Sequence, residues 1–438
     1  MPYVLPNPLL CDSELDLFSP ASPITQENKS GERTNVVTEQ TREGQCIMDV
    51  QILKERVSEF IDKHASEIVD LSLKIHSKPE LAFQEVEAAA NLAEFLKIHG
   101  LQVEMGTSGM QTAFKASVRG SSASPLLALL AEYDALPHVG HACGHNIIGA
   151  SAAAAGAALA ACGGDLPGSV WVLGTPAEEG GGGKVVMVKD GIFKDVDGVL
   201  MMHPTSGTSI MGGSSTAIHS FVIRYKGKPS HAAGSPHQGV NALDAATIFL
   251  TAVGLMRQHV KEEVRLHGII TRGGEASNII PEETEIRYMA RAKSRAVLDD
   301  AIEKVKRCIQ AGAVGTGCSV EVEERKGYEA TRHNSTLAAV LRDNYIRAGI
   351  EMAPEPRDGK GSTDLGDVSQ VVPQACAYPA IAPSSVAGHS HEFAQAAASP
   401  DGHRVLLLSA KAIAWAAIDI MSDPAILDAA WKEFDSKE

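Results

Sequence analysis

Strand-like apolar runs alternate with helical segments through the first half of the chain, and this alternation restricts the possible folds more than any other feature. The runs lie at residues 113–118, 126–131, 169–173 and 199–202, with an alanine-rich helical segment at 146–161 and a short helix after Lys184 between them. Strands that alternate with helices imply a mostly parallel sheet with helices on both faces. The sequence therefore predicts an α/β fold, in which the small residues of 149–156 let their helix lie close to the sheet.

Helical periodicity is found on both sides of this region. Apolar residues recur at three- and four-residue spacing over 52–75, up to a break at Pro79, and a second helix is expected at about 85–99. After Gly327, helices are expected at 337–348 and 404–421. The α/β pattern thus resumes near the C-terminus.

Between residues 214 and 326 the pattern changes to longer alternating strands, at 221–225, 264–271 and 285–291, around helices at 241–260 and 294–313. The order strand-helix-strand-strand-helix-strand is typical of a small α+β unit inserted into a larger domain. We therefore predict a flexible leader at 1–49, a first part of the α/β domain at 50–213, the insert at 214–326 and a second part at 327–438. The leader lacks hydrophobic periodicity and is expected to form no core.

Composition excludes some classes of function. A chain of 438 residues is long for one hydrophobic core, in agreement with two domains. Its 54 acidic and 39 basic residues give a net charge of -15, which argues against nucleic acid as a partner. No apolar run is expected to reach the roughly 18 residues of a membrane helix, and residues 1–19 do not resemble a secretory signal. Seven scattered cysteines favour a reducing, cytoplasmic location.

Polar residues with metal-binding side chains follow the predicted strands. Four of these residues lie just after such a strand: Asp134, Glu178, Glu179 and His203. In α/β sheets, functional groups gather at the carboxyl ends of the strands. Cys143 and His145 stand two residues apart, so in an extended chain both side chains leave the same face and can converge on one ion. The run 388–391 adds His389 and His391, and spacing alone does not decide between them.

This residue set predicts a metallohydrolase. The proposed ligands are Cys143, His145, Glu179, His203 and His389. Five protein ligands exceed what one catalytic zinc normally takes, so two metals that share Cys143 fit better. A divalent metal lowers the pKa of bound water to about 7 and polarises a carbonyl, and amide hydrolysis needs both effects.

The neighbouring carboxylates Glu178 and Glu179 are expected to have different tasks. Adjacent side chains diverge from an extended backbone, so one would ligate metal while the other moves the proton of the attacking water to the leaving amine. Four glycines follow at 180–183 and leave room for a substrate.

Other interpretations of single residues remain open at this point. A lone Cys143 is more often structural, and Cys143 with His145 also matches a cysteine nucleophile and its base. In that case the glutamate pair would have no task. His203 alone is equally compatible with a strand-end histidine, and Arg291 alone with a solvated strand-end charge.

Five motifs taken in order resemble those of the M20 metallopeptidase family: 131–137, 141–145, 174–180, 202–204 and 230–233. Within it they resemble the amidohydrolase subfamily with a Cys-Gly-His motif, and the peptidase M20 domain-containing protein 2 group of dipeptidases, which resemble aminoacylase-1. The resemblance spans about residues 50–415. Many relatives have aspartate where this chain has Asn146, although the dipeptidase-like branch also has asparagine. The resemblance implies a dinuclear zinc catalytic domain interrupted by a lid domain that also forms a dimer.

The resemblance also implies roles for individual residues. It assigns Cys143, His145, Glu179, His203 and His389 to the metals, with His389 favoured over His391, Glu178 to general base and acid, and Asp134 to a supporting carboxylate. His231 in the lid would be catalytic: it would reach the active site of the partner subunit and stabilise the tetrahedral oxyanion there. Asn278 and Arg291 would hold the carboxylate and oxyanion of the substrate, and Gly361 would line the pocket through its backbone.

The expected function is therefore that of a cytoplasmic, homodimeric amidohydrolase with two metal ions. Its substrate would be a small molecule, a dipeptide or an N-acyl amino acid with a free carboxylate. Thiolate favours zinc, while the carboxylate and imidazole ligands also accept manganese or cobalt. The alternatives are an amidase that acts on a specialised N-acylated metabolite and a pseudoenzyme that only binds ligands.

Overall fold

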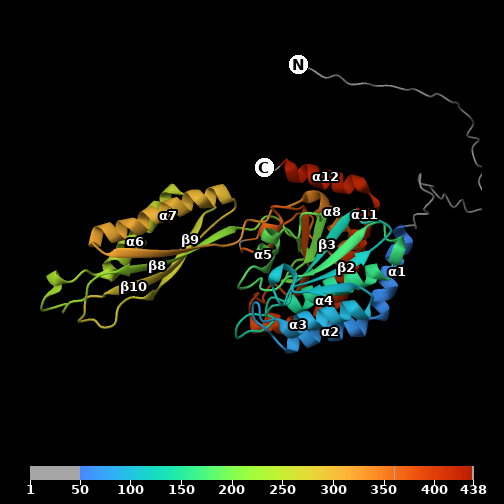
Figure 1. Ribbon diagram of the computed structural model, residues 1–438, viewed down its shortest axis with the longest axis horizontal. Coiled ribbons are helices and arrows are strands. Elements are labelled where there is room, and N and C mark those ends of the chain that lie inside the picture. Colours follow the sequence, from blue (N-terminus) through green and yellow to red (C-terminus); the bar gives the residue numbers. More distant parts are fainter. Residues whose placement is uncertain (1–49, 360, 437–438) are drawn as a thin grey trace, which may run out of the picture. The chain divides into compact units, whose positions relative to one another are not determined.

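The computed structural model describes residues 50–359 and 361–436, so the predicted leader at 1–49 lies outside the described residues. Within the described ranges the strands form sheets of seven, four and two strands. Figure 1 shows the seven-stranded sheet with its helices and a smaller unit labelled α6, α7 and β8 to β10. The α/β fold class and the separate antiparallel unit are as predicted.

The large sheet is parallel at its centre and antiparallel at its edges. Its order is β1-β2-β4-β3-β5-β12-β7, where β4 (Ser169–Gly174), β3 (Leu126–Ala131), β5 (Gly198–Met202) and β12 (Gln374–Tyr378) are mutually parallel. The edge strands β1 (Gln102–Met105), β2 (Phe114–Arg119) and β7 (Ile210–Met211) pair in the antiparallel sense. The carboxyl ends of the four central strands therefore meet at one edge of the sheet.

The core of this domain forms around β3, β5 and helix α4 (His145–Ala160). Every residue of β3 and β5 is buried, as expected for strands covered on both faces. Helix α4 is buried from His145 to Leu159 and packs on β3 and β4. A Cβ atom at Gly156 would lie 2.3 Å from Val172 Cγ2, so only glycine permits this close approach. The prediction that small residues bring this helix close to the sheet is confirmed.

Helices at both ends of the chain complete the domain. The predicted helix at 52–75 is in fact two helices, α1 (Val50–Lys63) and α2 (Ala65–Ser77), which are separated at His64. The helix expected at 85–99 is α3 (Val86–Ile98). All three contact α4.

Helix α11 (Pro400–Ser422) corrects one prediction about hydrophobic runs. It is the one helix of the described residues that is long and apolar enough to cross a membrane, whereas the sequence was expected to contain no such run. However, 67% of its most apolar window is buried, and it packs against α1, α4 and α8 (Ser335–Arg347). Burial of this kind is typical of a core helix in a globular domain.

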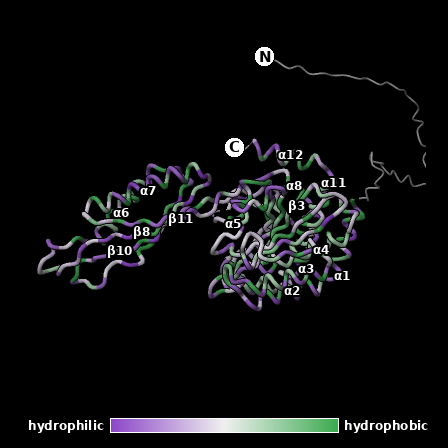
Figure 2. The backbone as a smooth tube through the Cα atoms, in the orientation of Figure 1, coloured by the Kyte–Doolittle hydropathy of each residue, from purple (hydrophilic) through white to green (hydrophobic). Residues whose placement is uncertain are grey.

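The four-stranded antiparallel sheet has the order β11-β8-β10-β9 and its own core. Its strands are β8 (Ala217–Lys226), β9 (Arg265–Arg272), β10 (Glu283–Ala292) and β11 (Ser319–Lys326). Buried and less buried residues alternate along β8 and β10, and the buried ones face α6 (Ala242–Met256) and α7 (Arg295–Thr316). Figure 2 colours the backbone of this unit by hydropathy. Asn241 and Ser294 cap these helices by accepting hydrogen bonds from the first turns. The predicted order of strands and helices in the insert is therefore present.

The remaining elements of the described residues are short or peripheral: η1 (Thr107–Gly109), η2 (Gly163–Asp165), α5 (Gly183–Asp190), β6 (Thr205–Ser206), η3 (Pro236–Gln238), η4 (Arg257–His259), α9 (Leu365–Val368), β13 (Ala380–Ala382), α10 (His391–Ala396) and α12 (Pro424–Asp435). Segment α5 matches the short helix expected after Lys184. The domain boundaries at 214 and 326 stay a prediction.

Candidate active site

The candidate ligands come from loops at the carboxyl ends of neighbouring parallel strands. Asp134 follows β3, Glu178 and Glu179 follow β4, His203 follows β5, and His389 lies in the segment after β12. The strand order therefore brings distant parts of the chain to one edge of the sheet.

Cys143 and His145 converge, but not for the reason that the sequence suggested. The segment is not extended, because Gly144 adopts a left-handed conformation with φ of 78° and His145 is already the first residue of α4. A Cβ at Gly144 would lie 2.4 Å from Pro204 Cγ, so no side chain fits there. A tight turn into a helix, rather than alternation along a strand, brings the thiol and the imidazole together.

Two histidines approach Cys143 from other loops. His203 Nε2 lies 3.3 Å from Cys143 Sγ, and His389 Nε2 lies 3.5 Å from it. The Nδ1 atom of His203 lies 2.9 Å from the carbonyl oxygen of Pro204, so an Nδ1–H tautomer leaves the Nε2 lone pair facing the thiol. His389 N donates to the carbonyl of Ala142 at 3.0 Å, which ties its loop to that of Cys143.

The spacing of the sequence left His389 and His391 as alternative ligands. In the structure only His389 lies beside Cys143 and Glu179. His391 is the first residue of α10 and belongs neither to the described candidate metal groups nor to the pocket lining.

Glu178 and Glu179 both lie near His145, but their other neighbours differ. Both side chains approach His145, and Glu179 alone also approaches Cys143 and His389, with Glu179 Oε1 3.4 Å from His389 Nε2. Desolvation raises the pKa of Glu178 well above its usual value, and the nearby charges of Glu132 and Asp364 raise it further. The two carboxylates therefore lie in different electrostatic environments.

A buried glutamate that the sequence did not single out supports this loop. Ala177 has a left-handed φ of 63°, which is uncommon for a residue with a side chain. Its N–H donates to Glu85 Oε1 at 2.8 Å, and Thr112 Oγ1 donates to Glu85 Oε2 at 3.0 Å. Glu85 therefore holds the backbone directly before Glu178.

The donor set fits divalent cations. Candidate ligand atoms lie within 4.8 Å of one another in three overlapping groups: Cys143–His145–His203, Cys143–Glu179–His389 and His145–Glu178–Glu179. His145 Nε2 and Glu179 Oε1 are buried without a hydrogen bond, and such atoms normally have a partner. Thiolate, imidazole and carboxylate together suit zinc and related metals. Because the groups overlap at Cys143, His145 and Glu179, the arrangement fits a pair of cations that these residues, with His203 and His389, would hold.

Asp134 orients two of the candidate ligands. Its Oδ1 lies 2.9 Å from His145 Nδ1, and its Oδ2 accepts from Glu179 N at 2.9 Å. Burial alone would raise the pKa of Asp134, but His145 and the N–H of Glu179 hold it at about 2. A carboxylate behind a ligating histidine fixes its ring orientation and raises its basicity.

A buried ion network beneath the site was not predicted. Lys184 Nζ lies 2.6 Å from both Glu132 Oε1 and Asp364 Oδ1, and all three side chains are fully buried. Burial would lower the pKa of Lys184, but the two carboxylates raise it above its usual value. Glu132 Oε2 also lies 3.4 Å from His145 Nε2. The network thus ties the loops after β3 and β4 to the segment that contains Asp364.

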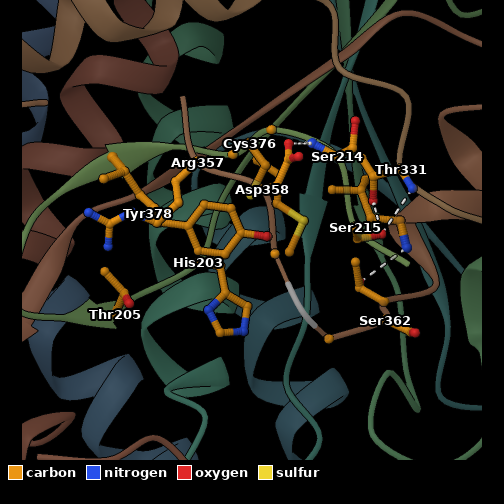
Figure 3. Close-up of a pocket in the computed structure, with 18 of the residues that line it drawn as sticks. His203, Thr205, Ser214, Ser215, Thr331, Arg357, Asp358, Ser362, Cys376 and Tyr378 are labelled. Carbon is orange, nitrogen blue, oxygen red and sulfur yellow. Dashed lines mark hydrogen bonds between the residues drawn. The ribbon is translucent and has the colours of Figure 1, made fainter. Parts of the chain in front are cut away.

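The cluster opens into a pocket of about 430 Å³. Its walls include Gly361, as expected, and Tyr378, which the sequence did not indicate. The Tyr378 ring stacks on His203 with centroids 5.5 Å apart (Figure 3). Arg291 Nη1 donates to Ser362 Oγ at 3.1 Å, which brings its guanidinium to the pocket wall. A tyrosine far from the motifs in sequence gives no spacing signal that could have identified it.

Two residues of the insert that the resemblance assigned to the site lie outside this pocket: Asn278, an expected substrate contact, and His231, expected to act in the pocket of a partner subunit. His231 and Asn278 are exposed and do not line it in the described chain. The N–H groups of Ala233 and Gly234 donate to His231 Nδ1, at 3.2 and 3.1 Å.

The chain belongs to peptidase family M20/M25/M40, whose model matches residues 128–412, and is a hydrolase of the metallopeptidase and amidohydrolase class. It is 38% identical to the Xaa-Arg dipeptidase of Mus musculus over an alignment of 405 residues. The alignment covers 89% of this chain and 94% of the mouse protein. The Xaa-Arg dipeptidase of Homo sapiens is 36% identical over 409 residues, with coverage of 89% and 93%. A dinuclear metal-binding M20 peptidase of Bacillus subtilis shares the fold, with a TM-score of 0.65, 20% identity and coverage of 82% and 99%.

Proposed function

We propose that this protein is a metal-dependent hydrolase that cleaves the amide bond of a dipeptide or an N-acyl amino acid with a free carboxylate. The observation that carries the proposal is the convergence of five candidate ligands beside Glu178 at the pocket: Cys143, Glu179, His203 and His389, which line it, and the buried His145. The mouse and human relatives are Xaa-Arg dipeptidases, which supports dipeptides as substrates, and in particular those that end in arginine.

Each side chain has a task in this reaction. The five candidate ligands would hold two divalent cations, as in the related Bacillus subtilis peptidase, and zinc suits the thiolate best while manganese and cobalt also fit. When bound, such ions polarise the scissile carbonyl and make water acidic enough to attack near neutral pH.

Glu178 would take the proton of the attacking water and pass it to the leaving amine. Burial raises its pKa above the usual value, and a carboxyl group with a raised pKa is suited to taking up a proton and passing it on. Arg291, whose planar guanidinium can bind a carboxylate through two parallel hydrogen bonds, would hold the free carboxylate of the substrate against the wall that contains Gly361.

A homodimer would complete the site. His231 and Asn278 are exposed, which suits side chains that act in the pocket of a partner subunit. Strand β9 lies at the edge of the lid sheet, and its Ile269 is 65% exposed, while Leu255 of α6 is 73% exposed. Unpaired strand edges and exposed apolar side chains are typical of interfaces. A cytoplasmic location stays an expectation from the sequence.

Removing the metal is expected to abolish hydrolysis. Treatment of the purified protein with a chelator should lower the rate on Gly-Arg by about 100-fold or more, because carbonyl polarisation and water activation are both lost. Adding back Zn²⁺, Mn²⁺ or Co²⁺ separately should restore the rate, and the ion that restores it best indicates the native metal. Amine release is measured for Gly-Arg, N-acetyl-arginine and an aryl amide without a carboxylate. Full activity after chelation would contradict the proposal, and hydrolysis of the aryl amide alone would favour the amidase alternative.

A further inference from the structure

The pocket contains a carboxylate with no part in the candidate metal chemistry. Among the described residues that line it, Asp358 is the only acidic side chain besides Glu178 and Glu179. It belongs to none of the described candidate metal groups. A charged side chain in the wall of a substrate pocket, away from the reacting atoms, is suited to binding the substrate.

The backbone holds the Asp358 carboxylate in place. Ser214 N donates to Asp358 Oδ1 at 3.0 Å, and Gly359 N donates to the carbonyl of Ser214 at 2.8 Å. Gly213 N donates to the carbonyl of Arg357 at 2.9 Å, so the segments 212–214 and 357–359 form one wall. Figure 3 shows the hydrogen bond between Ser214 and Asp358, with Arg357 directed to another part of the pocket. A carboxylate fixed in this way loses little freedom when a ligand binds.

Lys293 contacts the second oxygen of this carboxylate. Its Nζ lies 2.8 Å from Asp358 Oδ2. The hydrogen bond from Lys293 holds the pKa of Asp358 below its usual value, with a further contribution from Ser214 N–H, so the group is charged at neutral pH. The two side chains are 52% and 51% exposed, and ion pairs exposed to this extent are weak. A cation from the substrate can therefore displace Lys293.

The other charges of the pocket leave Asp358 available for a cation. Arg291 at the pocket wall and Arg357 in its lining are positive and suit the free carboxylate of the substrate. A guanidinium binds a carboxylate through two parallel hydrogen bonds, whereas an ammonium acts as a point charge. An arginyl side chain can thus form a better-matched contact with Asp358 than Lys293 does.

We propose that Asp358 binds the guanidinium side chain of a C-terminal arginine of the substrate, in exchange for Lys293. This inference rests on the proposed function, because it requires a dipeptide in the pocket.

Two substrates that differ only in charge test this subsite. Gly-Arg and Gly-citrulline have side chains of nearly the same shape, of which only that of arginine is charged. The wild type should show a kcat/KM about 10-fold or more higher for Gly-Arg, and Asp358→Asn should lower kcat/KM for Gly-Arg by about 10- to 100-fold while changing that for Gly-citrulline by less than about 3-fold. Glu355→Gln, an exposed acid on the same segment that does not line the pocket, should change neither.

Lys293→Met provides a second, independent variant that leaves Asp358 intact. Because it removes the competing cation, kcat/KM for Gly-Arg should rise by about 2- to 5-fold. The inference is wrong if Asp358→Asn lowers kcat/KM for both peptides equally, or if Lys293→Met lowers it for both. In either case the contact between Lys293 and Asp358 only fixes the insert against the α/β domain. If the wild type hydrolyses both peptides equally well, the subsite fails while the proposed function stands. If it hydrolyses neither peptide nor N-acetyl-arginine, both the subsite and the proposed function are wrong.

Discussion

Replacing Glu178 by glutamine is expected to lower kcat for dipeptide hydrolysis by about 10²- to 10⁴-fold, the range that loss of a general acid-base group produces. Glutamine has nearly the same size but takes up no proton at neutral pH. Glu178 is suited to that task because desolvation, together with the charges of Glu132 and Asp364, raises its pKa. Steady-state kinetics should show the loss in kcat with little change in KM, and metal analysis of the same preparation should show unchanged metal content.

A matched control variant shows whether loss of any glutamate, rather than loss of Glu178, lowers kcat. Glu94 is exposed on α3, so Glu94→Gln should have wild-type kinetics. A Glu178→Gln protein with a kcat within about 10-fold of the wild type would exclude Glu178 as the general base. If that variant also kept the full biological role of the protein, the pseudoenzyme alternative would gain support.

Replacing Lys184 by methionine is expected to lower the free energy of unfolding by about 3–5 kcal/mol, which is the effect of removing one partner from a buried ion pair. Methionine matches the length of the lysine stem but leaves Glu132 and Asp364 buried without their cation. Denaturant unfolding followed by circular dichroism measures the change.

The neighbouring Lys189 provides the control. It lies on the same helix α5 but is exposed, so Lys189→Met should change the free energy of unfolding by less than about 0.5 kcal/mol. Equal stability of the two variants would show that the buried network contributes nothing specific. We expect Lys184→Met to lower activity as well, since Glu132 also lies beside His145.

Hydrophobic patterning predicted most of the long helices and three of the four central parallel strands, because each of these segments buries a set of apolar residues. The fourth central strand, β12, was not predicted. The strand at 126–131 and the helix near 146–161 agree with β3 and α4 to within about one residue. Strands β1 and β11 carry largely exposed side chains, so apolar runs do not mark them. The division between α1 and α2 at His64 is not visible as a break in periodicity.

Motif spacing and the family resemblance together identified the candidate ligands, whereas the supporting residues needed three-dimensional information. Cys143, His145, Glu179, His203 and His389 stand in short motifs, and the structure brings all five together. Their roles in metal binding stay a prediction. Lys184 resembles an ordinary surface lysine in a short helix, and only the fold places it beneath the site. The four glycines directly before it are the one sequence signal that could have drawn attention to it.

Metal content per chain tests the central claim most directly. Inductively coupled plasma mass spectrometry on the purified wild type should find two divalent ions per chain, and Cys143→Ala should hold one or none, since its sulfur belongs to two of the candidate groups. A wild-type protein with no bound metal after growth and purification with added zinc, or a Cys143→Ala variant that keeps both ions, would contradict a paired-cation centre at these residues.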